Sequence, residues 1–186
     1  MANERARQRG ATLVEFGLAL PLLLLLLLAL IEYGRLMFLR NAVQEVSRRA
    51  ARAAALTDFS DAAAMQQLRL RALLRGDQDA LPLAPQVGSA NIRIDYLWMD
   101  AAGNLQPLPL LPACPLANRI NCAREAQGAS CIRFVRVRLC GSGPGCPPLA
   151  YQPLVPGIPV PDSLPLASTL APAESLGYVP GQAPCP

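Results

Sequence analysis

The sequence predicts an α+β protein in which a long N-terminal transmembrane and stalk helix precedes a small antiparallel-sheet domain with disulfides and a proline-rich tail. Three observations support this prediction. Residues 11–31 contain only one charged residue, Glu15, and include seven consecutive leucines. Two later segments alternate apolar and polar side chains, as half-buried strands do. All six cysteines and most of the prolines lie in the second half of the chain.

Residues 11–31, here called the apolar run, are long enough to cross a membrane. As a helix they would extend about 31 Å, and the hydrocarbon core of a bilayer is about 30 Å thick. Pro21 removes one helical hydrogen bond and crowds the carbonyl of Gly17, whose missing side chain leaves room for a kink. A cleaved secretory signal fits less well, because its apolar region usually has only about 7–15 residues. A simple uncleaved anchor stays open as an alternative.

Composition divides the chain into a leader (residues 1–10), a span (11–31), a stalk with a second helix (32–76) and a small α+β domain (77–186) with a proline-rich tail from about residue 141. In the stalk, an apolar stripe through Val43, Val46 and Ala50 indicates a helix that packs either on neighbouring subunits or on its own domain. The two interpretations are about equally favoured at this point.

A break at residues 57–61 precedes the second predicted helix, which we expect to be capped by Asp58 or Ser60 and to end at Gly76. Its expected buried face is Met65, Leu68 and Leu73.

The period of the apolar residues changes to two in the outer domain. Residues 91–99 and residues 131–140 each alternate as a strand with one buried face. A turn at residues 100–104 leads to a short return strand at Leu105, and residues 118–124 favour a helical turn. Residues 164–176 favour one more short strand. The tail is otherwise expected to be extended or polyproline II.

The even set of cysteines predicts disulfides and an oxidising compartment. Its members are Cys114, Cys122, Cys131, Cys140, Cys146 and Cys185. Cys131 and Cys140 lie at opposite ends of one predicted strand, roughly 30 Å apart, whereas a disulfide needs Cα atoms within about 7 Å. Cys140 with Cys146 is the easiest closure. Of the fifteen possible connectivities, we expect the one that adds Cys114–Cys122 and Cys131–Cys185.

The residue inventory argues against an enzyme. There is no histidine, which removes the commonest general base and zinc ligand. The glycines near residue 143 lack the lysine and following helix of a phosphate-binding loop. The formal charge of +4 falls to +2 without residues 1–10, so no nucleic-acid surface is expected. We therefore predict no catalysis, no cofactor and no metal.

Gly10 followed by ATLVE, residues 11–15, resembles the processing site of type IV prepilins, in which a prepilin peptidase cuts after the glycine. The continuation through Pro21 and the leucines ends in Glu32-Tyr33-Gly34-Arg35. This longer pattern resembles the TadE-like family, the minor pilins or pseudopilins of tight-adherence pilus systems. The resemblance covers about 45 residues well and the remainder only in outline.

The resemblance implies a structural role in pilus assembly, with Gly10 and Ala11 as the processing site. Glu15 would be the fifth residue of the mature chain, where it meets the N-terminal amine of a neighbouring subunit. The implied partners are the prepilin peptidase, other pilins or pseudopilins, the inner-membrane assembly platform and the lipid bilayer.

The implied location is a single pass through the bacterial inner membrane with the C-terminal domain in the periplasm, or in the pilus itself. A membrane-anchored periplasmic binding or adhesin domain without prepilin processing is one alternative. A pseudopilin of a secretion or DNA-uptake system is another.

Overall fold

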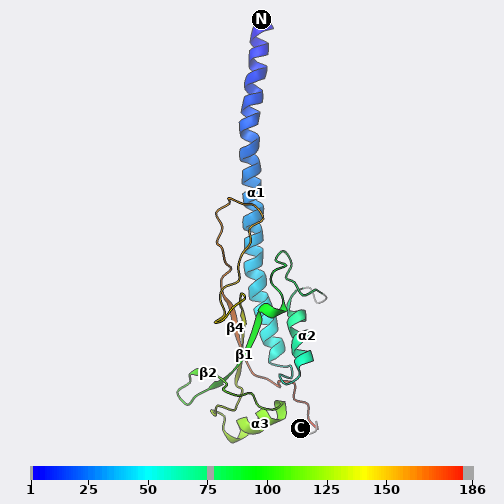
Figure 1. Ribbon diagram of the computed structural model, residues 1–186, viewed down its shortest axis with the longest axis vertical. Coiled ribbons are helices and arrows are strands. Elements are labelled where there is room, and N and C mark those ends of the chain that lie inside the picture. Colours follow the sequence, from blue (N-terminus) through cyan, green and yellow to red (C-terminus); the bar gives the residue numbers. More distant parts are fainter. Residues whose placement is uncertain (1, 75–77, 182–186) are drawn as a thin grey trace. The chain divides into compact units, whose positions relative to one another are not determined.

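A computed structural model describes residues 2–74 and 78–181 of the chain, with side chains from residue 12 onward. The chain forms two compact units. The first consists of Met1–Phe38 and Tyr151–Asp162, and the second of Leu39–Ala150 and Ser163–Pro186. The long helix α1 (Ala2–Ala54) contributes residues to both units (Figure 1).

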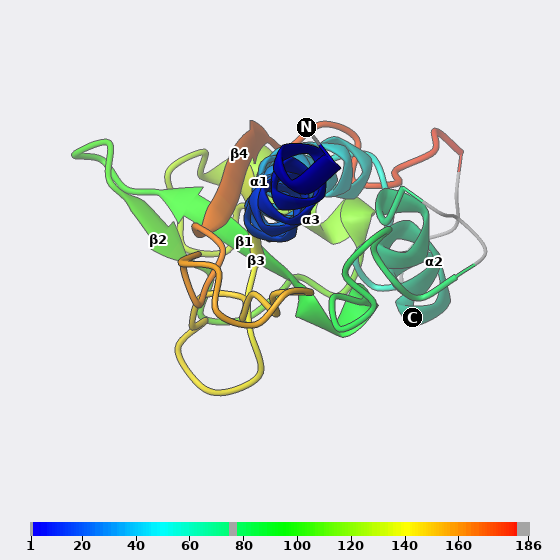
Figure 2. The ribbon, with the colours of Figure 1, turned by 90° about the horizontal axis from the view of Figure 1, so that it is seen from above.

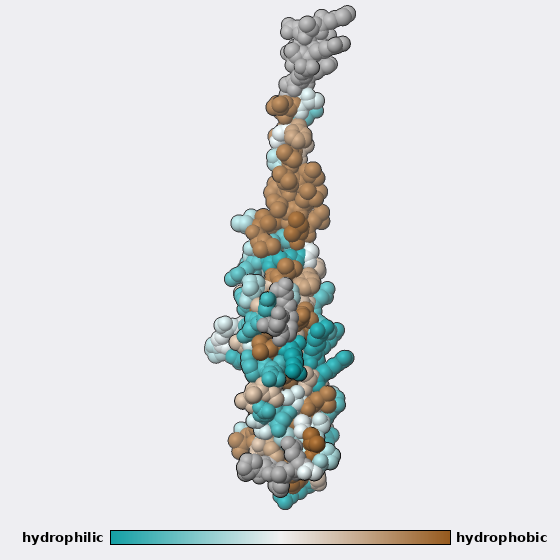
Figure 3. All heavy atoms as spheres, turned by 90° about the vertical axis from the view of Figure 1, so that its right-hand side faces the viewer, coloured by the Kyte–Doolittle hydropathy of each residue, from teal (hydrophilic) through white to brown (hydrophobic). Residues whose placement is uncertain are grey.

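In the first unit, α1 contains the apolar run. It is the only helix of the described residues that is long and apolar enough to cross a membrane, and none of its most apolar window is buried. Figure 3 shows the resulting apolar surface of α1 in brown. Such a helix indicates a membrane anchor or a signal sequence. α1 continues through Gly17 and Pro21, and a kink at this point stays a prediction.

In the second unit, the C-terminal part of α1 buries one stripe of side chains. The stripe recurs every three or four residues, as expected for one face of a helix, and it consists of Leu39, Ala42, Val43, Val46, Ala50 and Ala54. The Ser47 hydroxyl lies 2.7 Å from the Thr169 hydroxyl within the same unit. Of the two interpretations of this stripe, the structure confirms that it packs on its own domain.

The second predicted helix is α2 (Ala62–Ala72). It ends at Ala72 and not at Gly76 as expected, and its N-terminal cap also differs from our expectation. Met65, Leu68 and Leu73 are buried as predicted. The cap is Asp61, whose carboxylate accepts the amides of Ala63 and Ala64. The expected caps, Asp58 and Ser60, are bonded to each other in the preceding turn and are therefore not available.

The sheet has four antiparallel strands in the order β2-β1-β3-β4. The strands are β1 (Ile92–Met99), β2 (Leu105–Pro107), β3 (Phe134–Leu139) and β4 (Ala167–Pro172), and a short 3-10 helix, η1 (Ser89–Asn91), precedes them. The alternation in β3 is confirmed, because Val135, Val137 and Leu139 are all buried. The alternation expected for β1 is wrong in part, because the adjacent residues Tyr96 and Leu97 are both buried. Figure 2 shows the β1–β2 hairpin and α2 on opposite sides of this unit.

The disulfides confirm one predicted pair and correct the others. Cys140 is bonded to Cys146 as expected. The predicted Cys114–Cys122 and Cys131–Cys185 pairs are wrong, because Cys122 is bonded to Cys131. Cys114 is also in a disulfide, and Cys185 lies outside the described residues.

The reason for the Cys122–Cys131 pair is the helix α3 (Pro115–Arg124), which is longer than the predicted helical turn. Asn118 of α3 accepts the amide of Ile132, and Asn121 donates to the carbonyl of Ser130. These contacts bring α3 against residues 130–132, so that the Cα atoms of the two cysteines are 4.8 Å apart.

Candidate functional site

A buried, hydrogen-bonded polar site of the first unit lies one residue beyond the apolar run. It joins Glu32, Tyr33 and Arg35 of α1 to residues 151–162, which we call the strap. Glu32 is completely buried, and Arg35 is only 8% exposed. A buried carboxylate and a buried guanidinium are costly to desolvate unless their hydrogen bonds are satisfied, so the contacts of this pair decide whether the site is stable.

Glu32 receives three donors. Its Oε1 accepts the hydroxyl of Tyr151 and lies 3.3 Å from Nη2 of Arg35, while its Oε2 accepts the backbone amide of Leu154 at 3.0 Å. Burial alone raises the pKa of Glu32, but the bonds from Tyr151, Leu154 and Arg35 outweigh burial and lower the pKa below its ordinary value. Glu32 is therefore an ionised acceptor at neutral pH.

Arg35 connects the same helix turn to the strap in a second way. Its Nη2 donates to the carbonyl of Gln152, and its guanidinium lies 4.6 Å from the centre of the Tyr151 ring. Burial and the bond to Glu32 raise the pKa of Tyr151, so that its hydroxyl remains a donor. Carboxylate, phenol and guanidinium thus form one connected network.

The other arm of the strap is bonded to the neighbouring residue of α1. The Tyr33 hydroxyl donates to the carbonyl of Pro159 at 2.8 Å. The two ends of the strap are joined to each other, because the amide of Tyr151 donates to the carbonyl of Asp162 at 2.8 Å. The strap is therefore a closed loop whose two arms are both bonded to residues 32–35.

Sequence reasoning found half of this site. The cluster Glu32-Tyr33-Gly34-Arg35 stood out as part of a family resemblance, but its partners 117–126 residues away did not. The strap was expected only as part of an extended or polyproline II tail. The one signal in the sequence was a stretch of ten residues, 152–161, without charge and with four prolines.

The other residues singled out from the sequence lie elsewhere on α1. Glu15 is exposed on the helix, and Gly17 and Pro21 follow within the apolar run. Gly10 and Ala11 belong to α1, but their side chains lie outside the described part of the chain. These residues are not in contact with the strap in any described hydrogen bond.

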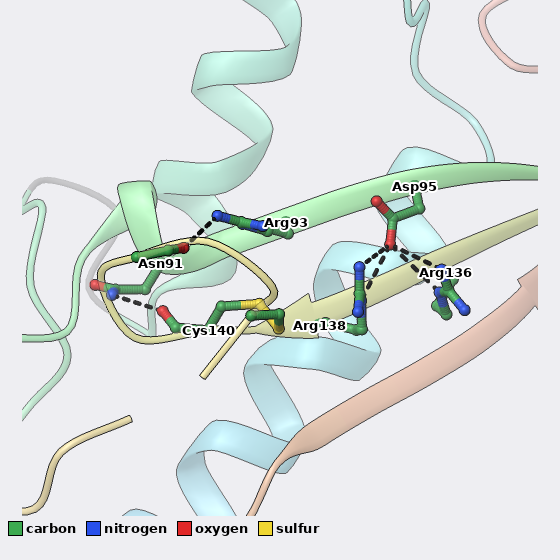
Figure 4. The surroundings of a disulfide bond; sticks show 8 residues. Asn91, Arg93, Asp95, Arg136, Arg138 and Cys140 are labelled. Atoms are coloured by element: carbon green, nitrogen blue, oxygen red, sulfur yellow. Dashed lines mark hydrogen bonds and ion pairs between the residues drawn. A yellow bond between two sulfur atoms is a disulfide. The ribbon is translucent and has the colours of Figure 1, made fainter. Parts of the chain in front are cut away.

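The second unit contains another polar cluster (Figure 4). It binds the loop that the Cys140–Cys146 disulfide closes. Arg93 donates to the carbonyl of Gly143 at 2.9 Å, and Asn91 donates to the carbonyl of Cys140 at 2.8 Å.

Next to this loop on the same strands, Arg136 and Arg138 both donate to one oxygen of Asp95, at 3.3 and 2.8 Å. All three side chains are partly exposed, so these ion pairs contribute little to stability.

The disulfides also bear on location. Disulfides persist in oxidising compartments, so those of the second unit indicate an extracytoplasmic domain. Together with one N-terminal apolar helix, they indicate a chain that is anchored at or exported across a membrane.

Comparison with known proteins identifies a family domain that covers most of α1, including the residues that bind the strap. Residues 10–52 match the family model described as TadE-like protein. Neither a curated protein nor a solved structure matches the chain. The matched segment contains the predicted cleavage site, the apolar run and the residues that bind the strap. Residues 10–52 of this chain therefore form a TadE-like family domain.

Proposed function

We propose that this chain is a minor pilin, or pseudopilin, that serves the assembly of a tight-adherence pilus. The observation that carries the proposal is the TadE-like domain at residues 10–52. A role in assembly of such pili is what the resemblance of this domain to TadE-like proteins implies. The role proposed here is accordingly structural, and no substrate or cofactor is part of it.

The proposed topology has residues 1–10 in the cytoplasm, residues 11–31 across the inner membrane and the second unit in the periplasm. Arg5, Arg7 and Arg9 support this orientation, because basic residues next to a span tend to stay on the cytoplasmic side. The disulfides of the second unit support it as well. The partners in this proposal are the prepilin peptidase, other pilins and the inner-membrane assembly platform.

Glu15 has a specific role in the proposal. Cleavage after Gly10 leaves Ala11 with a free amine, about 6 Å along the helix from Glu15. A lone charge is costly in lipid, and a pair of opposite charges offsets that cost. We propose that the Glu15 carboxylate pairs with the Ala11 amine of a neighbouring subunit, which sets the register between two apolar helices.

The decisive experiment is N-terminal sequencing of the protein recovered from envelope membranes, for the natural chain and for Gly10→Val. The proposal expects the natural chain to start at Ala11 and the variant to keep its leader. Gly34→Val is the matched control, because an added Cβ at Gly34 meets no atom within 4 Å, and it should still be processed. A natural chain that starts at Met1 would refute prepilin-type processing, and a start beyond Ile31 would reveal a cleaved signal.

A second variant tests Glu15 separately from processing. Glu15→Gln should be cleaved normally and should be lost from assembled pili or from the complex with other pilins. Normal incorporation of this variant would refute the proposed pairing without affecting the processing result.

A further inference from the structure

The strap meets α1 next to the end of the apolar run. Its first arm binds the ion pair of Glu32 and Arg35, through the carbonyl of Gln152 and the amide of Leu154. Its second arm is bonded at Tyr33 through Pro159. Residues 155–158 form the turn between these two arms. Figure 1 shows the loop beside α1.

The composition of this turn suits a nonaqueous environment. No charged residue occurs between Tyr151 and Pro161. The Leu154 side chain is 64% exposed, and Val155 and Ile158 are partly exposed. Exposed apolar side chains beside an exposed apolar helix form one continuous surface, which only lipid or protein can cover favourably.

The backbone of the strap also suits a nonaqueous environment. Irregular backbone is costly at membrane depth, because its amides lose their hydrogen bonds to water. Four of the ten residues 152–161 are proline and carry no amide hydrogen. The amide of Leu154 is already bonded to Glu32. The segment therefore gives up fewer amide hydrogen bonds to water than a ten-residue loop without proline would.

We propose that residues 154–158 of the strap insert into the boundary between headgroups and acyl chains of the bilayer that the apolar run spans. This inference rests on the proposed membrane anchoring. The ligand is the apolar part of the lipid surface, because the turn has no charge with which to select a headgroup. The buried network of Glu32, Arg35 and Tyr151 then holds a second membrane contact rigidly beside the helix.

A strap seated in the bilayer would restrict the motion of α1 in the membrane. A single apolar helix can rotate about its axis and change its depth and tilt at small cost. A loop bonded to one side of the helix and seated in the interface restricts both motions. The strap would thereby fix which face of α1 is presented to a neighbouring subunit, and with it the direction in which Glu15 projects from the helix.

The test uses the full chain in vesicles of phosphatidylcholine with and without bromine on the acyl chains, which quenches tryptophan at membrane depth. Trp98 is the only tryptophan, so each variant carries Trp98→Phe and one new tryptophan. Leu154→Trp reports on the strap. Leu24→Trp reports on the span. Met37→Trp is the matched control, because Met37 is also exposed but lies five helix residues beyond Glu32.

The proposal expects Leu154→Trp to lose fluorescence in brominated lipid nearly as much as Leu24→Trp, with a blue shift, while Met37→Trp keeps most of its fluorescence. Tryptophan itself favours the interface, and Met37→Trp carries the same bias. Ile158→Trp serves as a second reporter should Leu154→Trp misfold, with the same expected loss.

The outcomes separate this inference from the membrane anchor on which it rests. Quenching of Leu24→Trp without quenching of either strap reporter would overturn the strap proposal and leave the anchor intact. A blue shift of Leu154→Trp without bromolipid quenching would mean that a second protein copy covers the strap, which also overturns it. Loss of quenching for Leu24→Trp would refute the anchor itself.

Discussion

Tyr151→Phe should loosen the strap without unfolding the rest of the protein. The change removes the hydroxyl that donates to Glu32 and keeps the ring over Arg35. A hydrogen bond to a charged group contributes about 1.5–3 kcal/mol. Glu32 retains two partners in the variant, the Leu154 amide and Arg35, so we expect a loss of about 2 kcal/mol, toward the lower part of that range.

Hydrogen exchange of the Leu154 amide measures this loss directly, because that amide donates to Glu32 at 3.0 Å and is freed when the strap opens. Since about 1.4 kcal/mol corresponds to tenfold, its protection should fall roughly 30-fold at constant pH. Tyr33→Phe, which removes an exposed bond to Pro159, should cause a smaller change.

Tyr178→Phe is the matched control, because this tyrosine also lies against an arginine, Arg119, but belongs to the second unit. It should leave the protection of the Leu154 amide unchanged. Unchanged protection in Tyr151→Phe would refute the network described for Glu32. An equal loss in Tyr178→Phe would show that Leu154 reports global unfolding instead.

Three further outcomes are expected. The pKa of Glu32 is lower in the folded state, so its stabilisation of the strap is complete above about pH 4.3 and is lost as the pH falls through the folded-state pKa. Protection of the Leu154 amide from hydrogen exchange should therefore fall at that pH in the natural chain. In Glu32→Gln it should not change there. Gly177→Ala should lower the thermal midpoint more than Gly181→Ala. Both glycines have φ near +83°, but only at Gly177 does an added Cβ meet a backbone atom, at 2.5 Å. Equal shifts would refute the steric clash and attribute both losses to backbone strain. Replacing both cysteines of the Cys140–Cys146 bridge with serine should cost about 2–4 kcal/mol of unfolding free energy in denaturant titration, and an unchanged midpoint would contradict this.

Elements with a local pattern could be predicted from the sequence. The alternation in β3 and the stripe through Val43, Val46 and Ala50 identified their buried faces, because burial on one side imposes a period of two on a strand and about 3.6 on a helix. The turn before β2 was found from residues that favour turns. The ends of elements, such as the Asp61 cap of α2, were misplaced, and so was the strict alternation expected for β1.

Contacts between distant segments were not predicted in the same way. The Cys122–Cys131 pair depends on the docking of α3 by Asn118 and Asn121, and spacing along the chain carries no record of that docking. The partners of Glu32 were missed for the same reason. A proline-rich segment lacks the repeating hydrogen bonds that would impose a period on its sequence.

By itself, the sequence determined the apolar helix, its single carboxylate at Glu15 and the family resemblance of residues 10–52, because length, hydropathy and short motifs are properties of contiguous residues. Only the tertiary structure decided that Glu32 and Arg35 at the end of that helix are buried beneath a strap from the C-terminal part of the chain. Desolvation of that pair is tolerated because Tyr151, Gln152 and Leu154, far away in sequence, supply its hydrogen bonds.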